Sequence, residues 1–157
     1  MDIKELMEAF ARDFGVEGVA ADEDGVYTLS IDDMTVSFAE TPDARLATWA
    51  EVCEPPPEGR EHLYRTLMEA MFMGEGTGGA AFTIERETGK VYLHRFDALV
   101  ALDGESFKAM LENFVNVLEE WRGLIADFRP VFGEIEKAAD AAHDVRQEMD
   151  RGGFIQV

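Results

Sequence analysis

The chain has 157 residues, 46% of them hydrophobic, and 33 acidic against 14 basic side chains give it a formal net charge of −19. Its length indicates a single domain, and its hydrophobic content excludes a disordered chain. Because the negative charge repels phosphate backbones and anionic lipids, it argues against nucleic acid and membrane partners and favours basic partners.

Cysteine content and the start of the chain indicate the compartment. Cys53 is the only cysteine, which excludes an internal disulfide or a thiolate metal cluster. The N-terminal residues lack the basic start and apolar run of a signal peptide. No apolar stretch approaches the ~20 residues that a membrane span requires. We therefore expect a cytoplasmic protein.

Residues 2–14 carry apolar side chains at helical spacing, which predicts an amphipathic helix that Asp2 caps and Gly15 ends. Three strands follow, each predicted by alternating apolar and polar residues: 27–31, 34–38 and 45–52. A tight turn at Asp32 and Asp33 is expected to join the first two strands as a hairpin.

Prolines at positions 55–57 stop any regular element before a second predicted helix over residues 61–72. The glycine-rich stretch 74–79 then predicts a flexible connection. Residues 80–85 and 91–96 flank a turn sequence and predict a second hairpin.

The longest predicted helix covers residues 105–128. Its apolar residues recur alternately four and three positions apart, at Phe107, Leu111, Phe114, Leu118, Trp121, Ile125 and Phe128. A helix packed along a sheet explains this stripe, and we favour it over a coiled coil. Apolar residues become sparse after Pro130, so only a peripheral helix is expected there.

Together the elements predict an α+β domain over residues 1–129, in the order helix, three strands, helix, two strands, helix. We expect an antiparallel twisted sheet flanked by the helices. Residues 130–157 are expected to form a C-terminal helical extension and tail.

No motif for catalysis stands out in the sequence. The three histidines, His62, His94 and His143, lack metal-ligand spacing, and the glycine-rich stretch lacks the Gly-Lys-Ser/Thr ending of a phosphate loop. The acidic turn at 22–24 lacks the twelve-residue ligand spacing of a calcium loop. We therefore expect no metal, no cofactor and no enzymatic activity. An enzyme site assembled from scattered Asp, Glu and His residues stays an alternative.

Aromatic and methionine side chains are abundant instead. Eleven Phe, eight Met and two Trp exceed the needs of one modest core. Most of them must fill that core and a dimer interface, but a few on outer faces, such as Met7, Phe14 or Trp49, would form a binding surface. Methionine is deformable and suits surfaces that accept varied partners. The composition thus favours a binding protein.

Four short segments carry a family resemblance: Tyr-Thr-Leu-Ser-Ile-Asp-Asp at 27–33, residues 63–72, Gly-Lys-Val-Tyr-Leu at 89–93 and Ala-Leu-Asp-Gly at 101–104. With Phe114 and Trp121 on the last helix, and with the order of elements over residues 2–128, they resemble class I type III secretion chaperones of the Tir-chaperone family. The glycine-rich link and the extension after Pro130 depart from that pattern. A YbjN-like bacterial domain of similar fold is therefore the alternative.

The resemblance implies a homodimer that binds the N-terminal segment of a secreted effector in extended form and keeps it soluble and secretion-competent. The effector-binding residues that it implies lie on the first helix and the first strands: Leu6, Phe10, Phe14, Val36, Phe38 and Trp49. The dimer interface that it implies lies on the second helix and the last hairpin: Leu63, Leu67, Met71, Val91 and Leu93. The YbjN-like alternative would be a regulatory or small-ligand-binding domain that acts without an effector.

Overall fold

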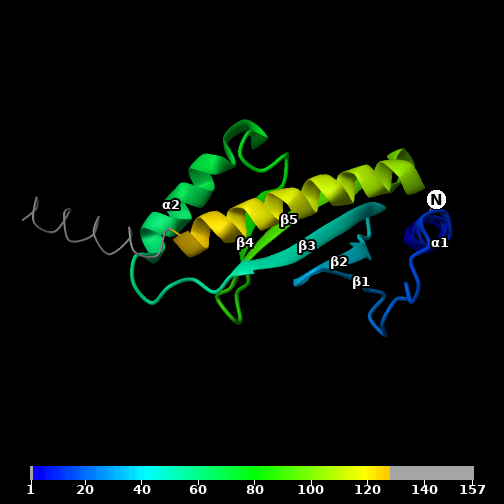
Figure 1. Ribbon diagram of the computed structural model, residues 1–157, viewed down its shortest axis with the longest axis horizontal. Helices are drawn as coiled ribbons and strands as arrows, with labels where there is room; N and C mark the ends of the chain where they lie inside the picture. Colours follow the sequence, from blue (N-terminus) through cyan, green and yellow to red (C-terminus); the bar gives the residue numbers. More distant parts are fainter. Residues whose placement is uncertain (1, 128–157) are drawn as a thin grey trace, which may run out of the picture.

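The computed structural model describes residues 2–127, in which three helices lie on one face of a five-stranded antiparallel sheet (Figure 1). The elements are α1 (Ile3–Phe14), β1 (Tyr27–Ile31), β2 (Met34–Glu40), β3 (Arg45–Cys53), α2 (Arg60–Ala70), β4 (Ala81–Ile84), β5 (Val91–Ala98) and a long helix over residues 104–127. Short 3-10 turns at Phe72–Gly74 and Leu99–Ala101 follow α2 and β5. The predicted fold class and element order are confirmed. Phe128 and the extension predicted over 130–157 lie outside the described residues.

The strand order in the sheet is β1-β2-β3-β5-β4, and every neighbouring pair is antiparallel. The predicted tight turn joins β1 to β2, and its residue Asp32 has a positive φ of 53°. β1 and β4 are the two edges of the sheet, with an isolated bridge from Ala21 to Tyr27 at the start of β1. The central strand β3 pairs with β2 on one side and β5 on the other.

Helix α1 begins at a capping box. The Asp2 carboxylate accepts the Glu5 N–H at 2.8 Å, and the Glu5 carboxylate accepts the Asp2 N–H at 3.1 Å. The Glu40 carboxylate on β2 accepts the Ile3 N–H at 3.2 Å. Gly15 ends the helix with a φ of 66°, a left-handed conformation that favours glycine. Both ends of the helix are where the sequence predicted them.

Replacing Asp2 by alanine should lower the free energy of unfolding by about 1 kcal/mol, because the Glu5 N–H loses its acceptor. Thermal unfolding measures the effect. The matched control is Asp2→Ser, since a serine hydroxyl also caps helices well. Equal midpoints for the wild type and Asp2→Ala would show that the cap contributes nothing.

The core lies between the sheet and the helices. The strand residues that face the helices are buried, and within each strand they alternate with more exposed residues, as the predicted strand pattern requires: Met34, Val36, Phe38, Leu46, Thr48, Ala50, Val52, Val91 and Leu93. The described stripe positions of the long helix, from Phe107 to Ile125, are buried against them. Phe107 packs against Phe10 and Phe38 with ring centroids 5.0 and 5.3 Å apart. The stripe therefore packs along the sheet, which is the arrangement favoured from the sequence.

The glycine-rich stretch, predicted as a flexible connection, forms a hydrogen-bonded turn instead. The Gly76 N–H donates to the Ala70 carbonyl at 3.1 Å, and the Trp121 indole N–H donates to the Gly76 carbonyl at 2.7 Å. A Cβ at position 76 would lie 2.8 Å from the Ala70 oxygen, so the close approach requires glycine. The turn thus ties the end of α2 to the long helix.

A reciprocal cap precedes the long helix. The Asp103 carboxylate accepts the Ser106 N–H at 2.8 Å, and the Ser106 hydroxyl accepts the Asp103 N–H at 2.8 Å. Hydrogen bonds from the Ser106 hydroxyl and N–H lower the pKa of Asp103. A carboxylate whose folded pKa is lowered adds stability above its unfolded pKa, and that stability is lost as the pH falls through the folded pKa.

Candidate functional site

Four of the six predicted effector-binding residues belong to the core. Leu6, Val36 and Phe38 are fully buried and Phe10 is 5% exposed. The reason is that the apolar stripe of α1 and the inward face of β2 pack under the long helix. The expectation that all six side chains line an exposed groove is therefore corrected for Leu6, Val36 and Phe38, whereas Phe10, although buried, still lines a groove from beneath.

Phe14, at the end of α1, is the predicted effector-binding residue of this helix that stays exposed, with 37% of its surface accessible. It lies in a groove of about 540 Å³ between α1, β1 and the long helix, here called the α1 groove. The groove is lined by Phe10, Phe14, Val16, Ile31, Lys108, Leu111, Glu112, Val115 and Asn116. The centres of the Phe14 and Phe10 rings are 5.4 Å apart, and the Lys108 ammonium lies 5.1 Å from the centre of the Phe14 ring. Apolar lining with charged residues beside it suits an apolar partner side chain.

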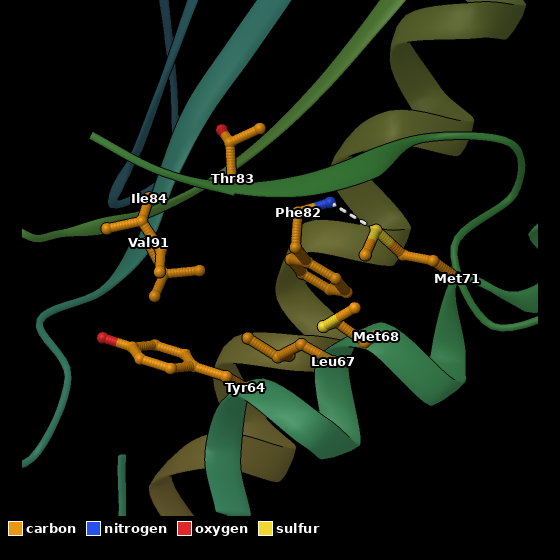
Figure 2. Close-up of a pocket in the computed structure, with 8 residues that line it drawn as sticks. All are labelled: Tyr64, Leu67, Met68, Met71, Phe82, Thr83, Ile84 and Val91. Atoms are coloured by element: carbon orange, nitrogen blue, oxygen red, sulfur yellow. Dashed lines mark hydrogen bonds between the residues drawn. The ribbon is translucent and has the colours of Figure 1, made fainter. Parts of the chain in front are cut away.

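A second groove, of about 410 Å³, lies between α2 and β4 and is here called the α2–β4 groove. Its lining residues are Tyr64, Leu67, Met68, Met71, Phe82, Thr83, Ile84 and Val91. Figure 2 shows side chains of α2 and of the strands turned toward one another across it. The Met71 sulfur accepts the Phe82 N–H at 3.0 Å and so holds helix and strand together. Met68 is 68% exposed and Ile84 is 51% exposed, so an apolar surface stays open to a partner.

Exposed apolar residues continue at the C-terminal end of α2. Phe72 is 73% exposed and Met73 is 81% exposed, and Phe72 shares a shallow hollow with Tyr64 and Met68. Met73 has a φ of 54°, which is uncommon for a residue other than glycine. None of these surface residues was predicted from the sequence, which assigned a binding role on the second helix to Leu63, Leu67 and Met71 only.

The predicted dimer residues divide between the core and the α2–β4 groove. Leu63 and Leu93 are buried in the core and line neither groove. Leu67, Met71 and Val91 line the α2–β4 groove, where Leu67 and Val91 are buried lining and Met71 is half-buried. The structure thus brings three of the five residues together on one surface.

Trp49, the remaining predicted effector-binding residue, lies on the sheet face that points away from the helices. It pairs with His94 across β3 and β5, and Tyr92 and Phe96 lie on the same face because alternate strand residues share a face. A hollow of about 300 Å³ on this face, here called the sheet-face hollow, is lined by Trp49, Thr83, Glu85, Tyr92 and His94.

The surroundings of His94 and Glu85 in the sheet-face hollow shift the pKa of each group. Burial lowers the pKa of His94, and its Nδ1 is buried with no hydrogen-bond partner in the described structure, so the imidazole is neutral at pH 7. The Thr88 hydroxyl and the N–H groups of Glu87 and Thr88 lower the pKa of Glu85, which keeps it ionised. The hollow therefore combines aromatic surfaces with one carboxylate.

Within residues 2–127, no group of three or more His, Cys, Asp and Glu side chains is arranged to hold a metal ion. No helix in that part of the chain is both long enough and apolar enough to cross a membrane. The candidate sites in the described residues include two apolar grooves and one aromatic hollow, besides the shallow hollow at the end of α2.

Comparison with known proteins identifies the family. The Tir chaperone protein (CesT) family matches residues 5–122. A Chlamydia pneumoniae protein is 28% identical over 122 residues, which cover 76% of this chain and 92% of that protein. A chain of the ExsC–ExsE complex has 27% identity and a TM-score of 0.65, covering 79% of this chain and 96% of that chain.

A chain of the HopA1–SchA chaperone–effector complex has the same fold, with a TM-score of 0.66 at 16% identity, over 76% of this chain and 92% of that chain. The family match favours the chaperone over the YbjN-like alternative. The chain belongs to the Tir chaperone protein (CesT) family, the family of type III secretion chaperones that the sequence resemblance implied.

Proposed function

We propose that this chaperone binds the N-terminal segment of its effector in extended form and keeps that segment soluble and competent for secretion. The observation that carries the proposal is the α1 groove, in which exposed Phe14 lies beside the edge strand β1. Apolar side chains of the segment bury in the groove while its backbone adds a strand to the sheet edge. Binding energy offsets the cost of ordering the segment, so no ATP is required.

Each predicted effector-binding residue has a part in this arrangement. Phe14 contacts the effector directly, and Phe10 contributes to the lining beneath it. Leu6, Val36 and Phe38 are fully buried. They therefore support the α1 groove from the core and do not touch the effector. Trp49 contacts the effector on the other face of the sheet, which an extended segment reaches by passing around the edge.

The charge of the chain supports the same function. A net charge of −19 keeps a protein with exposed apolar grooves in solution and attracts basic segments. The chaperone acts in the cytoplasm as a binding protein, without catalysis, cofactor, nucleic acid or membrane.

Two copies of the chaperone join through their α2–β4 grooves. Leu67, Met71 and Val91 line the groove, and exposed Met68 and Ile84 give it apolar surface that a second copy would bury. A two-fold dimer uses the same patch on both copies, so one continuous apolar surface is sufficient. Leu63 and Leu93 support the interface from the core.

Co-purification of the tagged chain from its native cell tests the proposed function. We expect capture of a secreted protein whose N-terminal segment resists limited proteolysis in the complex while the remainder is cut. Backbone amides of β1 should also gain protection from hydrogen exchange, because the effector adds a strand there. Capture of no secreted protein, or protection of a folded effector domain alone, would contradict the proposal.

Replacing Phe14 by serine should weaken effector binding about thirtyfold, since an aromatic anchor in a desolvated groove contributes about 2 kcal/mol or more. The matched control is Val100→Ser, because Val100 is 90% exposed and lines neither groove. Circular dichroism checks that both variants are folded, and calorimetric titration measures Kd. Unchanged affinity in a folded Phe14→Ser protein would show that the effector does not use the α1 groove.

A further inference from the structure

The sheet-face hollow contains more than an apolar binding surface requires. The aromatic residues Trp49, Tyr92 and His94 line it together with Glu85, whose carboxylate accepts hydrogen bonds from Glu87 and Thr88 at the adjoining turn. The faces of aromatic rings carry negative partial charge and attract cations. An apolar ligand would leave a carboxylate beside these rings without a partner, whereas a positively charged ligand would pair with it.

The same sheet face already holds one cation over a ring. The Arg45 guanidinium lies 4.8 Å from the centre of the Phe96 ring, and that ring packs edge-on against His94 at 5.3 Å. Arg45 is also paired with Asp43 at 2.7 Å, and Lys90 is paired with Glu51 at 2.9 Å. These neighbouring cations have carboxylate partners of their own, while Glu85 forms no ion pair among the described residues.

Glu85 is both fixed in place and able to accept further hydrogen bonds. Its Oε2 accepts the Thr88 N–H and hydroxyl, while its Oε1 accepts the Glu87 N–H at 3.0 Å. An ionised carboxylate has about four acceptor positions, so Oε1 has capacity for a guanidinium or ammonium donor. Neutral His94 adds aromatic surface without repelling a cation, since protonation would charge a ring whose Nδ1 is buried and unpartnered.

We propose that the sheet-face hollow binds an arginine or lysine side chain of the effector segment, with the cationic group at Glu85 and the alkyl chain against Trp49 and Tyr92. The inference rests on the proposed function and deepens it. Charge complementarity identifies the occupant, because a chain of net charge −19 draws basic segments toward it and the hollow offers a fixed carboxylate among rings. A basic residue bound there fixes the register of a segment whose other contacts are apolar.

Two short peptides test the inference without an effector. Acetyl-Leu-Arg-Leu-amide carries the cation, and acetyl-Leu-citrulline-Leu-amide is its neutral isostere. In nuclear magnetic resonance titrations the arginine peptide should bind roughly five- to thirtyfold more tightly. The resonances that shift should include the Trp49 indole N–H and the Tyr92 and Glu85 amides, while the indole of Trp121, hydrogen-bonded to Gly76, should stay in place.

Matched variants show whether the arginine peptide is preferred because of the sheet-face hollow or because of the overall negative charge of the protein. Glu85→Gln and Trp49→Leu should each bring the ratio of arginine to citrulline affinity close to one. Glu23→Gln removes the same charge in an exposed turn outside the hollow and should leave the ratio unchanged. Equal affinity of the two peptides, equal effects of Glu85→Gln and Glu23→Gln, or shifts confined to the α1 groove would each overturn the inference. Effector capture with no arginine preference would reject this inference alone, and arginine preference without any captured effector would reject the proposed function.

Discussion

Replacing Trp121 by alanine should lower the free energy of unfolding by about 3–5 kcal/mol, as truncation of a buried aromatic side chain generally does. Trp121 is 8% exposed, and its ring packs against Phe82 on β4 with centroids 5.2 Å apart. Its indole N–H also donates a hydrogen bond to the Gly76 carbonyl at 2.7 Å. One side chain thus joins the long helix, β4 and the turn after α2. Such a loss is a large fraction of the ~5–15 kcal/mol that stabilises an ordinary domain.

Chemical denaturation at one fixed protein concentration measures the effect, because dimerisation would make the midpoint depend on concentration. Trp121→Phe separates packing from hydrogen bonding: it keeps an aromatic ring and should lose only about 1 kcal/mol. Leu124→Ala, on the same helix but 38% exposed, is the control for helix truncation and should cost less than Trp121→Ala. A loss below about 1 kcal/mol for Trp121→Ala would contradict the proposed joining of the three elements.

Periodicity was sufficient to predict the fold because α1, the strands and the long helix each have one strongly apolar face. Each of these elements can bury its apolar face in only one direction. The structure buries the apolar stripe of α1, the inward residues of the strands and the stripe of the long helix in one core. The ends of α1 were predicted from single residues, since an aspartate side chain caps a helix start and a glycine backbone adopts the left-handed conformation that ends a helix.

The outward faces could not be predicted in the same way. In β3, Thr48 is completely buried while its neighbour Trp49 is only half-buried, although tryptophan is far more apolar than threonine. Alternation shows which residues share a face, but only the position of the helices decides which face becomes the core. Leu6, Val36 and Phe38 were assigned to a groove from the family resemblance, but they lie on the faces that the helices and the sheet bury against one another.

The glycine-rich turn shows a second limit of sequence analysis. Glycine signals conformational freedom in the unfolded chain, yet Gly76 serves a close approach to Ala70 and accepts a hydrogen bond from Trp121, 45 residues away. Contacts between residues so distant in sequence are invisible to local patterns. Met68 on α2, and Phe72 and Met73 in the 3-10 turn after it, were not predicted as surface residues, because a local pattern does not show which apolar side chains the rest of the fold leaves uncovered.

Replacing Met68 by glutamate should convert a dimer into a monomer of 17.5 kDa. Met68 is 68% exposed and lines the α2–β4 groove, so the change should leave the monomer folded while placing a charge in the proposed interface. A two-fold interface carries every substitution twice. If each unpaired buried carboxylate costs about 2 kcal/mol or more, the dimer dissociation constant should rise at least about a thousandfold.

Sedimentation velocity at micromolar concentration measures the association state, and circular dichroism checks the fold. Met68→Leu keeps an apolar side chain of similar volume and should remain dimeric. Val100→Glu introduces the same charge at a residue that is 90% exposed and lies outside the groove, so it should remain dimeric too. A monomeric wild type would reject the homodimer itself. If the wild type and the Met68→Glu variant are both dimeric, the interface must lie on another surface. Two facing carboxylates in a desolvated groove would raise the dimer dissociation constant too far for the variant to remain dimeric.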